Sequence, residues 1–567
     1  MKKIIKYIMA IAVASSAMFY SCETIELELV ENPNGLSEDQ ADPDLLLNAV
    51  QLGYLSNMGY FNGQASSLTR LNVFFSRDYF NGITPVSVNA VWTRTYSTTG
   101  TRGMIPNTFA IEALNAAAGD GSLDYQEAVA KTLLAHNMML LVDFIGDVPF
   151  SEANNPEEFP APNVDPGASV YEAALELLTE AQSLFAGGAV GTDLFYNTGA
   201  AANGDQYIKL IRTLRMKAAL TTGDLATFTS IESTGNFISS NDDDFQYNYV
   251  TNDVNPDGRH PDYAADYTPS GAALYQSNWL MNQMIESDDP RIRYYFYRQN
   301  DCTPGASCDP DGDGQTLSCS LIAPPVHYVN NPNGNFGDIF CFLEDGYWGR
   351  PHGDDQGTPP DSFFRTAVGV YPAAGFFDDN TFKNVGLGLG GGGAGIEPFI
   401  LASYVDFMRA EVRLAQNNAP AAAALMQSAI TKSTDKVLGF AALDASRDAS
   451  FEASAADVTA FIDAQVAAFN AAAPGDDQWN VLAENLYVTQ YGGGAEVYNF
   501  YRRTGYPTTL VPNLEPNPGP FVRSVPYPAN EVVANPNISQ KPNQNVQVFW
   551  DNNPPSAADF TGFPAAN

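Results

Sequence analysis

The chain has 567 residues and a formal net charge of −37 at pH 7. A surface this acidic repels nucleic acid and anionic lipid, so both are excluded as partners that bind through charge. The length would ordinarily suggest several domains, and 46 Gly, 37 Pro, 28 Tyr and 34 Phe residues predict long loops beside a sizeable core.

Residues 1–21 have the pattern of a secretory signal. Three lysines precede an apolar stretch that is too short to span a membrane as a mature helix, and Ser21 leads directly into Cys22. A cysteine after a small residue resembles a bacterial lipobox, so we expect Cys22 to be acylated and to anchor the protein to a membrane. Simple secretion with a spare cysteine is the alternative. The acidic residues 22–43 would then form a tether, and residues 44–567 the binding domain.

Helical periodicity dominates the first half of the chain. Asp42-Pro43 predicts the start of a helix, and Ser169 to Glu172 has the spacing of a capping box that opens another. A further helix is expected over 205–220. The segment 125–145 becomes apolar on all sides, which predicts deep burial. Apart from the signal, no run is expected to approach the ~20 apolar residues of a membrane span. The apolar face of the first helix carries Leu47, Val50, Tyr54, Met58 and Phe61.

The second half repeats this organisation. An amphipathic helix is expected over 401–415, followed by helices near 420–438, 456–472 and 478–491. Helix pairs with short connections predict a mainly α, helical-repeat scaffold, although no repeat of fixed period is visible. Loops this long are usually functional, so we expect them to form the working face. The loop-rich regions are 62–107, 222–270, 296–396 and 504–567.

The remaining four cysteines, Cys302, Cys308, Cys319 and Cys341, fall within one 40-residue stretch. An even number of clustered cysteines in an exported chain predicts two disulfides, with three connectivities open. A structural zinc site is the alternative, but the spacing is unlike the paired cysteines of such sites.

The run that begins at Asp309 starts like a calcium loop. Asp309, Asp311 and Asp313 occupy positions one, three and five, and glycine occupies position six. Position twelve is Ser320 where a bidentate acid is expected, so the run is not an EF-hand. Calcium binding and a solvated acidic turn both stay open, and no other cofactor is expected.

Aromatic residues in the predicted loops are the candidates for ligand contact. Flat apolar rings with polar groups at their edges suit the binding of sugar rings. The alternative for each residue is a small local hydrophobic core. The candidates are Trp92, Tyr96, Tyr347, Trp348, Phe376 and Phe377.

The sequence contains no pattern typical of catalysis. The four histidines form no HExxH pair, no GxSxG elbow occurs, and no pair of carboxylates stands out for glycoside cleavage. We therefore expect a binding protein. A secreted glycoside hydrolase and a structural surface-layer protein are the alternatives.

Several motifs, in one shared order, together resemble the SusD/RagB family of outer-membrane nutrient-binding lipoproteins. They are Gly146-Asp147-Val148-Pro149, Asp289-Pro290-Arg291 after a helix over 272–287, a helix from Glu397 through Glu411, Arg502-Arg503-Thr504-Gly505-Tyr506-Pro507, and Arg523-Ser524-Val525-Pro526-Tyr527-Pro528. They span nearly the whole chain after the signal, and they are scaffold-forming motifs that do not mark a ligand site.

The resemblance implies a single large domain, built as a superhelix of four tetratricopeptide-like helix pairs with a loop-rich irregular half. It also implies a location on the outer membrane facing the cell exterior, and a TonB-dependent barrel as partner. The implied function is capture of a glycan and its delivery to that barrel. A peptide is the alternative ligand, because the RagB side of the family looks peptide-directed.

Overall fold

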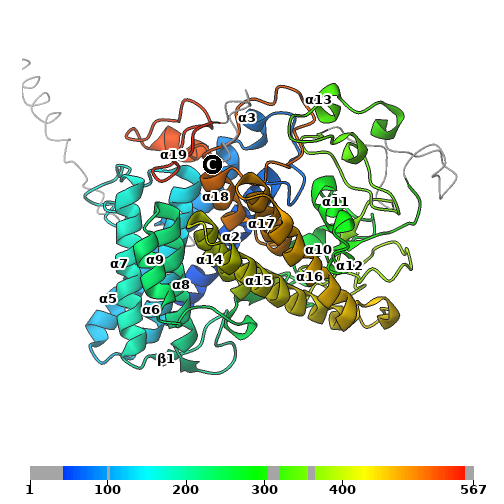
Figure 1. Cartoon of the computed structure of the whole chain (residues 1–567). Coiled ribbons are helices and arrows are strands. Elements are labelled where there is room, and N and C mark those ends of the chain that lie inside the picture. Colours follow the sequence, from blue (N-terminus) through cyan, green and yellow to red (C-terminus); the bar gives the residue numbers. More distant parts are fainter. Residues whose placement is uncertain (1–41, 99–102, 304–317, 356–363, 556–567) are drawn as a thin grey trace, which may run out of the picture. The chain divides into compact units, whose positions relative to one another are not determined.

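The protein contains two blocks of helices, joined by long loop-rich segments (Figure 1). The computed structural model describes residues 42–98, 103–303, 318–355 and 364–555. The first block contains α2 (Pro43–Leu68), α4 (Asn89–Tyr96), α5 (Met104–Ala118), α6 (Asp124–Ile145), α7 (Gly167–Ala186), α8 (Asp205–Thr222) and α9 (Leu225–Glu232). The second contains α14 (Ala402–Ala415), α15 (Ala419–Gly439), α16 (Ala455–Ala471), α17 (Asp476–Thr489) and α18 (Ala495–Thr504).

Consecutive helices pack against each other in pairs. The most extensive contacts join α6 with α7 and α14 with α15; α8 packs on α9, α16 packs on α15 and α17, and α2 contacts both α6 and α18. The predicted helices over 205–220, 401–415 and the three that follow are confirmed within a few residues. This arrangement confirms the mainly helical, tetratricopeptide-like fold, and residues from Pro43 onward form one compact unit.

Helix α2 begins at Pro43, as the sequence predicts, and its five predicted core residues are buried. Helix α6 is buried at every position from Glu127 to Ile145. Among the described residues it is also the one helix long and apolar enough to cross a membrane, contrary to the expectation that no such run exists. Its apolar window lies completely inside the protein, so packing against α2 and α7 accounts for its composition.

The strands are short and pair in twos, all antiparallel. They are β1 (Val190–Gly191) with β2 (Ala202–Asn203), β3 (Phe245–Asn248) with β6 (Ile396–Ile400), and β4 (Phe296–Tyr297) with β5 (Ala367–Val368). In the second pair Gln246 faces Pro398 and Tyr247 faces Glu397. The predicted helix from Glu397 is therefore wrong at its start, because residues 396–400 are buried in this ladder and α14 begins only at Ala402.

The predicted capping box at Ser169 is also wrong. Helix α7 begins at Gly167, and its N-cap Pro166 provides no side-chain hydrogen bond. Instead, the backbone N–H of Gly167 donates to Asp147 Oδ1 at 2.8 Å. A carboxylate from a distant turn thus satisfies this helix N-terminus, which sequence spacing alone does not reveal.

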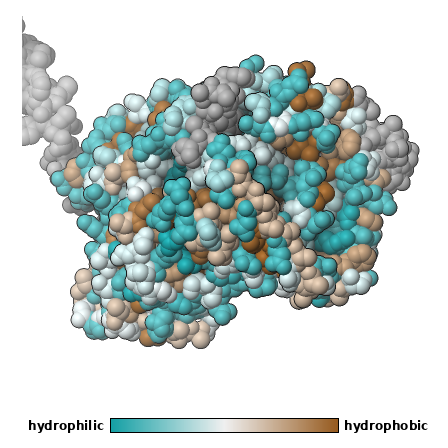
Figure 2. All heavy atoms as spheres, in the orientation of Figure 1, coloured by the Kyte–Doolittle hydropathy of each residue, from teal (hydrophilic) through white to brown (hydrophobic). Residues whose placement is uncertain are grey.

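The loop-rich regions carry more regular structure than expected. Region 62–107 includes the last turns of α2, all of α4 and the first residues of α5. Further short helices are α3 (Tyr79–Gly82), α10 (Pro261–Asp266), α11 (Asn278–Glu286), α12 (Ile292–Tyr295), α13 (Val326–Val329) and α19 (Ala529–Ala534). The face drawn in Figure 2 is largely hydrophilic, with hydrophobic residues in small separate patches, as the high charge predicts.

Candidate functional site

The aromatic residues predicted to contact ligand are not exposed on loops. The exposed fractions are 1% for Trp348 and Phe377, 5% for Phe376, 6% for Trp92 and 7% for Tyr347, and Tyr96 is half-buried. The expectation of open stacking surfaces at these positions is corrected by the structure.

Trp348 shows why an aromatic residue of a long loop can be buried. Its indole Nε1 donates to the backbone oxygen of Cys302 at 2.9 Å, and its ring packs against Phe364 with centroids 5.4 Å apart. A tryptophan whose N–H is satisfied by a backbone carbonyl is stable in an apolar interior. The loops therefore have their own core, and Trp348 belongs to it.

The other predicted aromatic residues pack in the same way. Trp92 lies on α4 and contacts Tyr96 and Tyr527, with ring centroids at 4.5 and 6.5 Å. The hydroxyl of Tyr96 donates to a backbone oxygen at 2.8 Å. Phe376 and Phe377 pack against buried tyrosines at 4.7 and 4.9 Å. Local core packing, the alternative interpretation, describes these residues.

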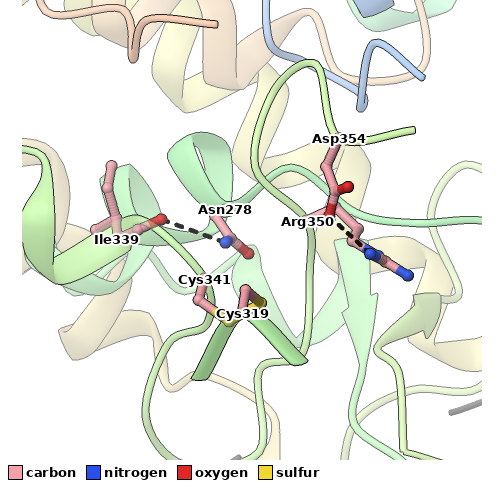
Figure 3. Close-up of a disulfide and its surroundings, with 6 residues drawn as sticks. All are labelled: Asn278, Cys319, Ile339, Cys341, Arg350 and Asp354. Carbon is pink, nitrogen blue, oxygen red and sulfur yellow. Dashed lines mark hydrogen bonds and ion pairs between the residues drawn. A yellow bond between two sulfur atoms is a disulfide. The ribbon is translucent and has the colours of Figure 1, made fainter. Parts of the chain in front are cut away.

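One of the predicted disulfides is defined, between Cys319 and Cys341, with Cα atoms 5.6 Å apart (Figure 3). Cys302 is also disulfide-bonded. The other predictions in this region, Cys308 and the calcium candidates Asp309, Asp311 and Asp313, lie outside the described residues. The signal sequence, the lipid-anchor candidate Cys22 and most of the tether lie outside them as well.

Three segments far apart in the sequence meet at Gln276. Residue Asn72 forms an isolated bridge with Gln276, and the backbone N–H of Arg350 donates to the Gln276 oxygen at 2.9 Å. A second bridge joins Ser277 to Arg350. These contacts explain why α11 begins at Asn278 and not near residue 272, since the preceding residues are extended.

The junction presents two stacked aromatic rings. Phe75 follows Asn72 and Tyr275 precedes Gln276, and their rings are nearly parallel, at 6° with centroids 6.3 Å apart. The Phe75 side chain is 55% exposed, whereas its neighbour Phe74 is buried. Tyr275 is half-buried. A flat apolar surface is therefore available to a ligand at this point.

Two arginines lie over the Tyr275 ring. The guanidinium carbons of Arg350 and Arg365 lie 4.1 and 3.9 Å from the Tyr275 ring centre, and Arg350 donates to the Tyr275 hydroxyl at 2.9 Å. Both arginines are buried, and Arg350 forms an ion pair with Asp354 at 2.7 Å (Figure 3). They hold the tyrosine ring in place through cation–π contacts.

Arg77, two residues after Phe75, is an accessible cation. Its side chain is 45% exposed and pairs with Asp355 at 2.7 Å and Glu515 at 3.5 Å. Hydrogen bonding to Asp355 raises the Arg77 pKa, which keeps the guanidinium charged. We call Phe75, Tyr275, Arg77, Arg350 and Arg365 the aromatic platform.

The platform combines an apolar ring face with charged donors and acceptors at its edge. This combination suits a ligand that has both a flat apolar face and hydroxyl groups, because the face stacks while the edge groups form hydrogen bonds. Sequence reasoning missed Phe75 and Tyr275. The available signal was Phe74-Phe75 followed by Arg77 directly after a helix, which is weak without knowledge of the junction at Gln276.

Comparison with solved structures identifies the same fold in other proteins. A SusD/RagB family protein from Bacteroides thetaiotaomicron has a TM-score of 0.63 at 16% identity, covering 90% of this chain and 99% of that chain. A SusD homologue from Bacteroides fragilis has a TM-score of 0.57 at 17% identity over 90% and 99%. A chitin-binding protein has a TM-score of 0.63 at 18% identity over 90% and 100%. These likenesses establish the fold.

The sequence itself matches a family profile over residues 40–313, the SusD-like family described as starch-binding and associating with the outer membrane. By the sequence of residues 40–313 and by its fold, the chain is SusD-like. None of the curated proteins matches this SusD-like protein. The SusD-like family consists of nutrient-binding proteins associated with the outer membrane, and its members bind their ligands without being enzymes. The aromatic platform lies mainly within the matched residues, which include Phe75, Arg77 and Tyr275.

Proposed function

We propose that this SusD-like protein captures oligosaccharides at the cell surface and delivers them to a TonB-dependent barrel in the outer membrane. The observation that carries the proposal is the exposed Phe75 ring, stacked parallel to Tyr275, which Arg350 and Arg365 hold in place. The exposed Phe75 ring offers an apolar face to a sugar ring, and Tyr275, held by Arg350 and Arg365, supports it from behind. Arg77, two residues further along the chain, and its carboxylate partners supply exposed polar groups for sugar hydroxyls.

We expect Phe75→Ala to weaken glycan binding by about tenfold, since an aromatic contact contributes about 0.5–1.5 kcal/mol beyond its buried area. Tyr275→Ala should weaken binding at least as much, because it also removes the anchor for two arginines. The measurement is native gel retardation in soluble starch, followed by calorimetry with maltoheptaose. A chitin oligomer and a tryptic peptide mixture serve as comparison ligands.

Phe80→Ala is the matched control. Phe80 lies five residues further along the chain and is 69% exposed, and it forms no ring contact within the described residues. It should bind glycans as the unchanged protein does. Equal losses in Phe75→Ala and Phe80→Ala would contradict the platform as the site. If the protein binds peptides tightly and no glycan retards it in the gel, its ligand is a peptide and not a glycan. If oligosaccharides become shorter after incubation with the protein, the protein cleaves them, which contradicts a function in binding alone.

The proposal includes a lipid anchor at Cys22 and a tether over residues 22–43. An acylated Cys22 would hold the protein at high effective concentration beside the barrel. We expect Cys22→Ser to move the protein from the membrane fraction to the soluble fraction, with loss of the barrel from co-purified material. Fractionation and mass spectrometry of the N-terminal peptide provide the readout. An unmodified Cys22 in a freely released protein would contradict both the anchor and the outer-membrane location.

A further inference from the structure

A large cavity lies away from the aromatic platform, between the C-terminal end of α11, helix α12 and the segment 319–345. Its volume is about 1160 Å³, enough for a ligand of several sugar rings. Residues 450–453 and Asp457 at the start of α16 complete the wall. We call this the α11–α16 cavity.

The wall of the cavity is fixed by covalent and polar links. The disulfide between Cys319 and Cys341 closes the segment into a loop, and both cysteines line the cavity (Figure 3). Asn278 Nδ2 donates to the backbone oxygen of Ile339 at 3.3 Å, which ties the same segment to α11. The cavity is therefore largely preformed.

The charges in the cavity do not cancel. Four carboxylates in its lining, Glu286, Asp288, Asp338 and Glu344, form no ion pair within the part of the chain that the structure describes. Two arginines also line the cavity, Arg293 and Arg298.

Both arginines are already engaged. Arg298 pairs with Asp378 at 2.7 Å, and Arg293 donates to the Asp378 backbone oxygen at 2.9 Å. Each also lies over an aromatic ring, Arg298 over Tyr347 at 4.8 Å and Arg293 over Phe451 at 5.3 Å. A concave site with an excess of carboxylates that form no ion pair has a negative electrostatic potential, which attracts a cationic ligand.

Tyr347 provides an observation independent of the acidic residues. Its side chain is only 7% exposed and lines the cavity, yet its hydroxyl has no hydrogen-bond partner within residues 42–98, 103–303, 318–355 and 364–555. The ring is buried while the hydroxyl keeps access to the cavity, so this hydroxyl is available to bond to a ligand there. Burial raises the pKa of Tyr347 to about 12, so the hydroxyl stays protonated and can both donate and accept.

We propose that the α11–α16 cavity binds an oligosaccharide that carries free, positively charged amino groups. The ammonium groups would pair with Glu344 and Asp338, the sugar rings would lie against the exposed apolar wall, and a ring hydroxyl would bond to Tyr347. This deepens the proposed function, on which it rests for the glycan class, and adds a second site with its own specificity.

Two other ligand classes fit less well. A peptide that adds to a sheet edge would need a strand, and no strand in the described residues lines the cavity. A bound metal ion would need several ligands within one coordination sphere, and the described residues contain no cluster of three His, Cys, Asp or Glu side chains suited to it. Dispersed carboxylates match the spaced charges of a polyamine sugar.

The test is calorimetry on the full chain with three tetramers: glucosamine, N-acetylglucosamine and maltotetraose, at low and high salt. The charged tetramer should bind at least about tenfold more tightly than its acetylated form, and raising the salt should weaken it. Glu344→Gln and Asp338→Asn should each lower its affinity severalfold, and so should Tyr347→Phe. Glu176→Gln, an exposed acid on α7, should have no effect. Equal binding of the charged and acetylated tetramers, or full affinity in Glu344→Gln, would overturn the proposal.

Phe75→Ala separates the two sites. It should weaken maltotetraose binding and leave binding of the charged tetramer unchanged. If Phe75→Ala weakens the binding of both tetramers, the amino sugar binds at the platform. This result would overturn the cavity proposal but not the proposed function of the platform. Binding of the charged tetramer without any neutral glycan would support the cavity while contradicting the platform.

Discussion

Asp143→Ala is expected to lower the free energy of unfolding by about 3–5 kcal/mol, the usual cost of removing one partner of a buried ion pair. Asp143 is completely buried near the end of α6. Its carboxylate pairs with Lys217 of α8 at 3.0 Å and accepts from Asn499 of α18 at 2.9 Å. It also accepts from Trp550 Nε1 at 2.9 Å and from the Tyr171 hydroxyl on α7.

One side chain therefore joins four helices and the C-terminal segment. Burial alone would raise the pKa of Asp143, but Lys217, Tyr171 and Arg502 together hold it below its ordinary value. Without the carboxylate, the buried Lys217 ammonium would keep only Glu496, at 3.1 Å. The loss should therefore exceed that of an ordinary hydrogen bond, since a buried charge becomes poorly compensated.

Urea-induced unfolding followed by circular dichroism measures this effect. Asp463→Ala on α16 is the matched control, because Asp463 is exposed and forms no interaction within the described residues. It should change the free energy of unfolding by less than about 0.5 kcal/mol. An Asp143→Ala protein as stable as the control would show that the network does not hold the helix blocks together.

The helices could be predicted because their signal is local. The apolar residues of α2 recur at helical spacing, and Pro43 fixes its start, so periodicity and a start signal suffice. Helices α14 to α17 follow from the same reasoning. The predictions fail where a group distant in sequence determines the local structure. Asp147 accepts a hydrogen bond at the start of α7, and β3 pairs with residues 396–400.

The candidate site could not be predicted in the same way, because it depends on contacts between segments hundreds of residues apart. Phe75 and Tyr275 come together only through the bridges at Gln276. Composition made the loop aromatics candidates for ligand contact, yet it could not separate the exposed Phe75 from the buried Trp348. A tryptophan in a loop is as easily a core residue as a ligand contact when a backbone carbonyl satisfies its N–H.

Glu397→Gln is expected to remove a pH-dependent loss of stability of the folded protein. Glu397 of β6 is buried, and burial raises its pKa from 4.5 to about 8. Asn62 donates to its Oε1 at 2.8 Å and Tyr249 approaches its Oε2 at 3.5 Å. The negative charge of Asp262 raises the pKa of Glu397 further.

The direction of the pH dependence follows from the proton affinity of Glu397 in the folded and in the unfolded state. The folded state binds the Glu397 proton more tightly than the unfolded state, so this contribution to stability is full below pH 4.5. It is lost progressively as the pH rises from 4.5 through about 8. At about 1.36 kcal/mol for each pKa unit, the full loss is on the order of 5 kcal/mol. Glutamine keeps the shape and the oxygen that Asn62 contacts, but it cannot ionise.

The measurement is the free energy of unfolding from urea titrations at pH 5 and pH 9, for Glu397→Gln and for the unchanged protein. Other groups titrate in this range, including Lys541, whose pKa burial lowers to about 7. The difference between the two proteins cancels their contributions. Glu397→Gln should be close to the unchanged protein at pH 5 and more stable by several kcal/mol at pH 9. Parallel pH profiles would mean that Glu397 is ionised in the folded state, and that water or a small local opening solvates the β3–β6 ladder.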